Sequence, residues 1–112
     1  MGISTHILDT ALGRPAAGVT VILERDEGGS WIRLSCATTD QDGRCKHLLP
    51  ESQPLQTGVY RIRFATAAYF ASRKLETLYP CIDVVFEVAK PQEHYHVPLL
   101  LTANGYTTYR GS

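Results

Sequence analysis

The chain has 112 residues, with eleven Lys and Arg balanced by eleven Asp and Glu, so its net charge at pH 7 is zero. This balance, with no basic cluster, argues against a nucleic-acid partner and against an anionic membrane surface. There is no run of about 18 apolar residues and no charged-then-apolar leader, so we expect no membrane span, no signal peptide and a cytoplasmic location. The length predicts one domain, residues 1–112, with a small core that oligomerisation would stabilise.

Alternating apolar residues separated by turns dominate the chain. They predict eight short strands, at residues 4–9, 19–25, 31–37, 44–48, 58–65, 82–89, 94–101 and 106–109. One helix is predicted at 66–74, with Thr66 as its N-cap. In the strand at 31–37, Ile32 and Leu34 supply the apolar bulk. Many short strands with one helix favour a sandwich of two antiparallel sheets.

The two ends of the chain carry the polar residues of most interest. In the first strand, Thr5 and Ile7 share one face, and His6 and Leu8 share the other. Residues 94–101 read His-Tyr-His-Val-Pro-Leu-Leu-Leu, which turns both histidines away from an apolar core face. Asn104-Gly105 predicts a tight hairpin turn into the last strand. The polar C-terminal segment, which ends at Ser112, is a candidate part of a functional site.

The cysteines and histidines do not predict a metal centre. Cys36, Cys45 and Cys81 are an odd number without a Cys-x-x-Cys pair, a usage typical of reduced thiols in a cytosolic protein. The spacing His94-x-His96 supplies two ligands of a zinc site but no third. No Gly-x-Ser-x-Gly elbow points to a serine nucleophile. We therefore expect neither a metal nor a cofactor.

Taken singly, His6, Arg44, His47, His94 and His96 read as ordinary exposed residues. Four stretches together carry more information. They are Ser-Thr-His-Ile-Leu-Asp-Thr at 4–10 with Gly-Arg-Pro-Ala at 13–16, Thr39 to Arg44 with its Asp-Gly-Arg, the histidine stretch at 94–101, and Tyr-Arg-Gly-Ser at 109–112. With these motifs the chain resembles the transthyretin-related proteins along nearly its whole length, and within them the enzyme branch, the 5-hydroxyisourate hydrolases. Transthyretin proper, the hormone carrier, lacks the paired histidines, the arginine and the Tyr-Arg-Gly-Ser ending.

The resemblance implies a fold and an assembly. The fold is all-β, a transthyretin-like sandwich of two four-stranded antiparallel sheets with one short helix, which agrees with the strand count above. The assembly is a homotetramer, a dimer of dimers, with active sites at the dimer–dimer interface. Its central channel would be lined by the first, seventh and eighth strands through His6, Leu8, His96, Pro98, Thr107 and Tyr109. A polar sheet face enclosed by symmetry suits a site of this kind.

The resemblance also implies an activity. The substrate is 5-hydroxyisourate, and its six-membered ring is opened by water to 2-oxo-4-hydroxy-4-carboxy-5-ureidoimidazoline in urate degradation towards allantoin. His6 and His96 would activate water and relay protons, and at least one of two neighbouring histidines is expected to be neutral near pH 7. Arg44 would bind the substrate and stabilise the oxyanion. Ser112, through its hydroxyl or its terminal carboxylate, would orient a histidine or the substrate, and Tyr109 would help to form the pocket.

Two functions of other classes stay open on the sequence. The chain would bind a small aromatic ligand in the channel without turnover if it were a carrier of the transthyretin type. It would use the sandwich only as a scaffold if it were an interaction domain. The paired histidines and the arginine disfavour the carrier, because a channel for an aromatic hormone needs no base.

Overall fold

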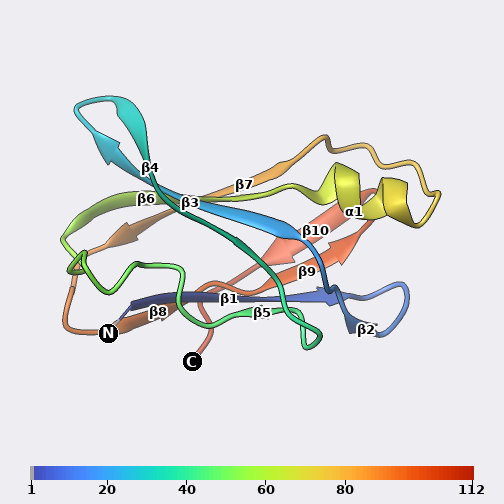
Figure 1. Cartoon of the computed structure of the whole chain (residues 1–112), viewed down its shortest axis with the longest axis horizontal. Helices are drawn as coiled ribbons and strands as arrows, with labels where there is room; N and C mark the ends of the chain where they lie inside the picture. The colour runs from blue at the N-terminus through green and yellow to red at the C-terminus, as the bar shows by residue number, and fades with distance from the viewer. Residues whose placement is uncertain (1) are drawn as a thin grey trace.

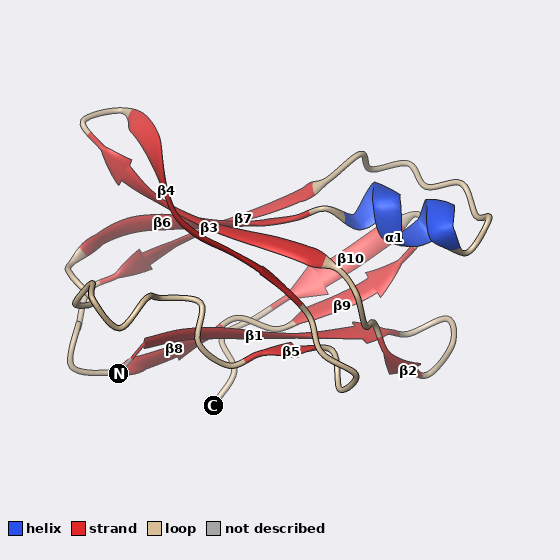
Figure 2. Cartoon of the chain, viewed as in Figure 1, coloured by secondary structure: helices blue, strands red, loops and turns tan. Residues whose placement is uncertain are grey.

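The computed structural model describes residues 2–112, and it stacks two β-sheets with a short helix, α1 (Thr66–Ser72), at one end (Figure 1, Figure 2). The first sheet has the order β4-β3-β6-β7, with β3 (Thr20–Glu27), β4 (Ser30–Thr38), β6 (Gly58–Phe64) and β7 (Ile82–Val88). The second is built around β1 (Gly2–Asp9) from β2 (Arg14–Pro15), β5 (Arg44–Cys45), β8 (His94–His96), β9 (Leu99–Thr102) and β10 (Gly105–Thr108). The predicted all-β sandwich is confirmed, with six strands rather than the predicted four in the second sheet.

The second sheet is mixed, whereas the sequence predicted only antiparallel pairing. β1 is antiparallel to β2 and β5 but parallel to β8 and β9. The strand predicted at 94–101 is divided into β8 and β9 around Pro98, which has no N–H to give to a ladder. The chain still follows β1 across the break, because the Val97 N–H donates to the Ser4 carbonyl at 2.9 Å. The hydroxyl of Thr5 also donates to the Val97 carbonyl, at 2.6 Å.

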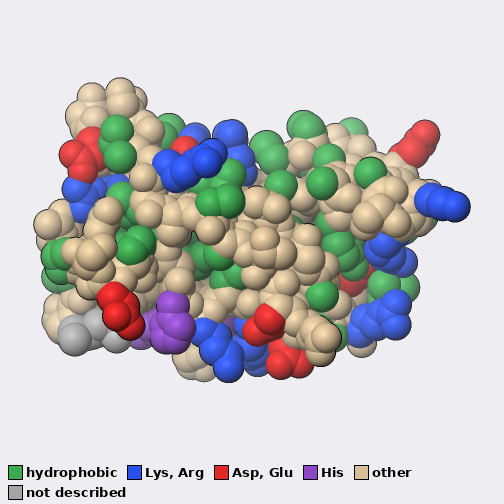
Figure 3. Space-filling view, in the orientation of Figure 1, with side chains coloured by type: hydrophobic (Ala, Val, Ile, Leu, Met, Phe, Trp, Pro, Cys, Tyr) green, Lys and Arg blue, Asp and Glu red, His purple; other side chains and the backbone are tan. Residues whose placement is uncertain are grey.

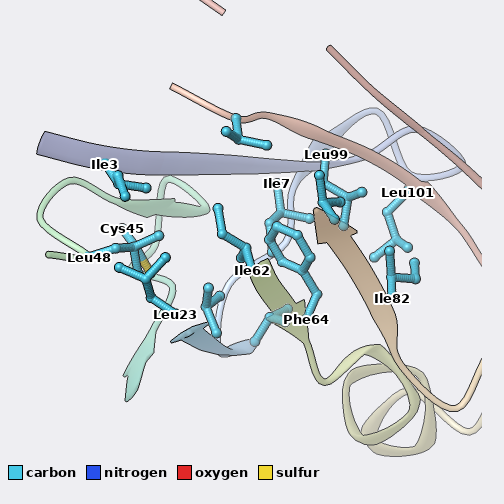
Figure 4. Packing of buried hydrophobic residues seen from close by; sticks show 14 of the residues in the cluster. Ile3, Ile7, Leu23, Cys45, Leu48, Ile62, Phe64, Ile82, Leu99 and Leu101 are labelled. Carbon is cyan, nitrogen blue, oxygen red and sulfur yellow. The ribbon is translucent and has the colours of Figure 1, made fainter. Parts of the chain in front are cut away.

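Apolar side chains from both sheets meet between the layers (Figure 4). The fully buried residues shown there include Ile3, Ile7, Leu23, Leu48, Ile62, Phe64, Leu99 and Leu101. The core face predicted for residues 94–101 is confirmed, because Tyr95, Val97, Leu99 and Leu101 are all buried. Strand alternation therefore directs the neighbouring histidines, and the even-numbered residues of β1, to the outer side of the second sheet.

Two turn regions differ from the prediction. The last hairpin turns at residues 103–104, because Gly105 already pairs with Thr102, so β10 begins one residue earlier than predicted. Of the two residues predicted to supply apolar bulk in the strand at 31–37, Leu34 packs against the core, whereas the side chain of Ile32 is 47% exposed. A register shift at Leu23/Glu24 interrupts the β3–β4 pairing, and the hairpin tip curls away from the second sheet (Figure 1). This tip consequently has no opposing layer.

The helix is shorter than predicted and is anchored through a side chain of β1. Thr66 is not its N-cap, because Ala65 holds that position and the Thr66 hydroxyl is buried without a hydrogen-bond partner among the described residues. The buried carboxylate of Asp9 accepts hydrogen bonds from the Tyr69 hydroxyl at 2.7 Å and from Arg73 Nη1 at 2.8 Å. Within residues 2–112, no helix has the length and apolar character needed to cross a membrane.

Candidate active site

The polar residues gather on the outer side of the second sheet. The register of β1 and β8 pairs Gly2 with His94 and Ser4 with His96, so both histidines lie beside the start of β1. Figure 3 shows a histidine side chain next to Lys and Arg side chains along the lower edge of the molecule. This edge corresponds to the layer of β1, β5 and β8 in Figure 1, and the C-terminus lies there as well.

An open cleft of about 330 Å³ occupies this face. Its lining residues are Ser4, Thr5, Arg44, Lys46, His94, His96 and Ser112. The cleft thus brings together three of the residues predicted from the sequence, Arg44, His96 and Ser112, which come from distant parts of the chain. Two imidazoles, two cationic side chains and three hydroxyl side chains line the same space.

The other two predicted residues lie outside the lining of this cleft. His6 is half-buried on β1 and pairs in register with Arg44 of β5, which keeps it on the same face as Ser4. Tyr109 is 54% exposed and lines a different hollow, together with Arg110 and residues of β7. One chain alone therefore does not bring Tyr109 to the histidines.

A tight turn presents Arg44 to the cleft. The carboxylate of Asp40 accepts hydrogen bonds from the backbone N–H groups of Asp42 and Arg44, both at 2.9 Å. The bond from Arg44 is the main reason that the pKa of Asp40 is lowered. Gly43 lies between them with φ of +74°, and its carbonyl accepts the Ile7 N–H at 2.8 Å. The Asp-Gly-Arg motif is thus a turn that docks β5 on β1.

We expect Gly43→Ala to destabilise the fold by roughly 2–4 kcal/mol. An alanine would adopt a left-handed conformation, and its Cβ would overlap the Ile7 carbonyl oxygen. Urea unfolding of the variant and the parent protein measures this difference. Gly28→Ala is the matched control, because Gly28 has φ of +62° but its Cβ would meet nothing within 4 Å. Equal stability of Gly43→Ala and the parent would contradict the packing described here.

The end of the chain is fixed against β8. The Gly111 N–H donates to the His96 carbonyl at 2.8 Å, and the two residues form an isolated antiparallel bridge. The Arg110 guanidinium lies 4.4 Å from the centroid of the Tyr95 ring and pairs with Glu93 at 3.1 Å. These contacts deliver Ser112 to the cleft. Gly111 also touches the His96 ring so closely that a Cβ there would overlap the imidazole.

With His96 in the role of base that the family resemblance implies, we expect Gly111→Ala to lower turnover by about 10- to 100-fold, since displacing a reacting group by about 1 Å has effects of that size. The added methyl group would push the His96 ring from its position. Turnover and thermal stability of the variant should be measured together. An alanine variant with parental turnover would show that the ring position is not set by this contact.

The sequence did not predict four residues of the cleft lining as site residues: Ser4, Thr5, Lys46 and His94. Ser4 Oγ lies 2.7 Å from His94 Nε2 and 2.8 Å from His96 Nδ1, so one hydroxyl joins the two imidazoles. His94 was interpreted as an ordinary surface residue, and Lys46 was not considered. The available signal was alternation, because Ser4 shares its strand face with His6, and His94 shares its face with His96.

Both histidines of β8 are biased towards the neutral form. Burial lowers the pKa of His96, and the charges of Arg44, His6 and His94 lower it further. Burial also lowers the pKa of His94, with a further contribution from His47. Near pH 7 these imidazoles are therefore available as bases. By contrast, burial raises the pKa of the Cys45 thiol to about 11, so this neighbour of Arg44 is not a thiolate nucleophile.

This arrangement suits general base catalysis next to a fixed cation. A neutral imidazole can take a proton from water, and a guanidinium can stabilise negative charge on a carbonyl oxygen. Among residues 2–112, no group of three or more His, Cys, Asp or Glu side chains is arranged to hold a metal ion. The fold and the cleft together define a transthyretin-like β-sandwich with acid–base groups on its outer sheet face.

The family follows from the sequence. Residues 3–111 match the model of the HIUase/Transthyretin family, and the chain belongs to this family. It is 52% identical over 110 residues to a 5-hydroxyisourate hydrolase of Salmonella typhimurium, covering 98% of this chain and 80% of that protein.

Two solved structures are also similar. One is the 5-hydroxyisourate hydrolase of Klebsiella pneumoniae, with a TM-score of 0.86, 37% identity and full coverage of both chains. The other is sea bream transthyretin in complex with thyroxine, with a TM-score of 0.91, 32% identity and coverage of 99% of this chain and 95% of that one.

Proposed function

We propose that this protein hydrolyses 5-hydroxyisourate, opening its six-membered ring to 2-oxo-4-hydroxy-4-carboxy-5-ureidoimidazoline in urate degradation. The observation that carries the proposal is the cleft that joins Arg44 and His96 on one sheet face. The names of the relatives from Salmonella typhimurium and Klebsiella pneumoniae support the same reaction. Ring opening needs a base for water and a stabiliser for the oxyanion, and the cleft offers both.

The proposed roles follow the chemistry of each side chain. His6 and His96 activate the water and relay protons, and the lowered pKa of His96 supports a neutral base there. Arg44 binds the planar substrate and stabilises the developing oxyanion through its forked, permanently charged guanidinium. Ser112, which lines the cleft, orients a histidine or the substrate. Tyr109 completes the pocket.

A carrier function is the alternative, since the fold matches sea bream transthyretin as well as it matches the Klebsiella enzyme. Backbone similarity therefore does not distinguish a carrier from a hydrolase. The side chains of the cleft provide the distinction. The imidazoles and the guanidinium of the cleft favour hydrolysis, because binding of an aromatic ligand requires no general base.

We further propose a cytoplasmic homotetramer, a dimer of dimers whose dimer–dimer interface encloses the cleft. The open form of the cleft in one chain supports this assembly, because a neighbouring copy would exclude water from it. Tyr109 is exposed and does not line the cleft of its own chain, so it can contact the cleft of a neighbouring subunit. The balanced charge and the unpaired cysteines support the location. Light scattering after gel filtration would measure the mass of the assembly.

The test of the activity is the ultraviolet absorbance of freshly generated 5-hydroxyisourate. We expect the protein to accelerate this decay relative to a protein-free sample. The mass of the assembly does not test the activity. Decay at the uncatalysed rate would overturn the proposed hydrolysis and favour the carrier.

A further inference from the structure

We propose that the Ser4 hydroxyl passes a proton from His96 to His94, so that His94 holds the positive charge generated when His96 activates water. Ser4 and His94 are then positioning residues for the base, beyond the roles given to His6, Arg44 and Ser112. The inference rests on the proposed hydrolysis, and its own test includes a measurement that needs no substrate.

The geometry restricts the protons of this triad. Ser4 Oγ is within hydrogen-bond distance of His94 Nε2 and of His96 Nδ1, at 2.7 and 2.8 Å. A hydroxyl has one proton, so it can donate to only one of the two nitrogens. The other ring nitrogen must then carry its own proton and donate to Ser4 Oγ. The protonation of the two imidazoles is therefore coupled through one side chain.

One of the two arrangements prepares His96 as a base. In it, His96 Nδ1–H donates to Ser4 Oγ, and the Ser4 hydroxyl donates to His94 Nε2. The remaining nitrogen of His96, Nε2, keeps its lone pair free to accept a proton from water. Ser4 thus selects the tautomer of His96, as a hydrogen bond on one ring nitrogen does for the other.

The relay balances in protons and charge. Water gives a proton to His96 Nε2, and the resulting hydroxide attacks the carbonyl carbon of the substrate. His96 Nδ1 then gives its proton to Ser4 Oγ while the Ser4 proton moves to His94 Nε2. His96 ends neutral with its proton on Nε2, and His94 ends as the cation. When His96 Nε2 gives its proton to the nitrogen released by ring opening, the relay runs back, from His94 Nε2 to Ser4 Oγ and from Ser4 to His96 Nδ1, and the starting state is restored.

The surroundings favour movement of the charge away from His96. Its neighbours on the site face include Arg44 and His6, whose charges oppose an imidazolium there. The charges of the N-terminal amino group and of His47 both oppose protonation of His94, and Lys46, Ser112 and His96 line the same cleft. His94 is exposed, whereas His96 is half-buried, so water solvates a cation at His94 better.

The backbone at Ser4 is held independently of its hydroxyl. The Ser4 carbonyl accepts the Val97 N–H, and the neighbouring Thr5 hydroxyl binds the Val97 carbonyl. Ser4→Ala should therefore keep the β1–β8 pairing and lose only the bridge between the rings. Ser4→Thr keeps a hydroxyl at the same position. His47→Gln is the matched control, because it removes an imidazole near His94 that does not contact Ser4.

The first measurement records the ring ¹⁵N shifts of His96 by NMR on the protein without substrate. We expect a protonated Nδ1 and a bare Nε2 in the parent protein at neutral pH. In Ser4→Ala we expect the proton to move substantially to Nε2, with Ser4→Thr and His47→Gln resembling the parent. Unchanged His96 shifts in Ser4→Ala would overturn the relay, whatever the activity of the protein.

The second measurement is the pH dependence of ring opening. We expect Ser4→Ala to lower kcat by about 10- to 100-fold with little change in KM. This loss is part of the rate enhancement of roughly 10²- to 10⁴-fold that a positioned general base contributes. The acidic limb of kcat/KM should move to lower pH, because the lost acceptor stabilised the imidazolium of His96. Ser4→Thr should recover most of the rate, and His47→Gln should retain it.

The outcomes separate the two proposals. A Ser4→Ala variant with parental kcat and an unshifted profile would overturn the relay and leave the hydrolysis intact. A parent protein without ring-opening activity would overturn the hydrolysis, and the NMR result would still decide whether Ser4 couples the two imidazoles.

Discussion

His96→Ala is expected to lower kcat by roughly 10²- to 10⁴-fold, the contribution of a positioned general base. The variant should fold, because β8 is held by its backbone pairing with β1 and by the burial of Tyr95 and Val97. Stopped-flow absorbance with freshly generated 5-hydroxyisourate would give kcat, and circular dichroism would check the fold.

The lowered pKa of His96 also predicts how kcat/KM depends on pH. Burial, Arg44 and the other histidines lower the pKa of His96 from its ordinary value of 6.5, so the neutral base persists to pH values below 6.5. The kcat/KM of the parent protein should therefore fall only when the pH drops into that range, and the limb should vanish in His96→Ala. If the acidic decline of kcat/KM persists in His96→Ala, another group causes it. Parental turnover in His96→Ala would show that His96 takes no part in the reaction.

Arg44→Ala is expected to lower kcat by roughly 10²- to 10³-fold, because the variant loses the guanidinium that we propose stabilises the oxyanion. The side chain is exposed in the cleft, while the turn that carries it is held by backbone bonds to Asp40, so the fold should persist. Arg44→Lys keeps the charge but loses the planar fork, and we expect an intermediate rate.

The matched control for Arg44 is Arg33→Ala. Arg33 is also exposed, but it lies on β4 in the other sheet. Its replacement should leave turnover unchanged. A second signature distinguishes Arg44 from a simple binding residue: without its charge, the pKa of His96 should rise towards 6.5, and the acidic limb should move to higher pH. Parental turnover in Arg44→Ala would contradict its assignment to the oxyanion.

The layers of the fold could be predicted because alternation is a local property. Odd-numbered residues from Tyr95 to Leu101 are buried as the pattern predicts, and so are Tyr60, Ile62 and Phe64. The parallel pairing of β1 with β8 and β9 is not a local property, since it joins residues about ninety positions apart in the sequence. The break at Pro98 and the exposure of Ile32 likewise depend on which strand or layer lies opposite.

The candidate site was predicted in part for the same reason. The motifs that carry the family resemblance identified Arg44, His96 and Ser112, and these three line one cleft. Ser4 was missed because its hydroxyl gains meaning only from the cross-strand register that puts it between His94 and His96. Lys46 follows β5 in the chain, and its approach to the histidines also results from pairing between distant segments.

The most direct test of the account is the number of substrate molecules that one protein chain consumes. Freshly generated 5-hydroxyisourate should be mixed in large excess over the protein, and its ultraviolet absorbance followed beside a protein-free sample. We expect accelerated decay that continues through many turnovers and is lost in Arg44→Ala. A brief loss of signal equal to the amount of protein, followed by the uncatalysed rate, would contradict the account, because it would indicate binding without hydrolysis.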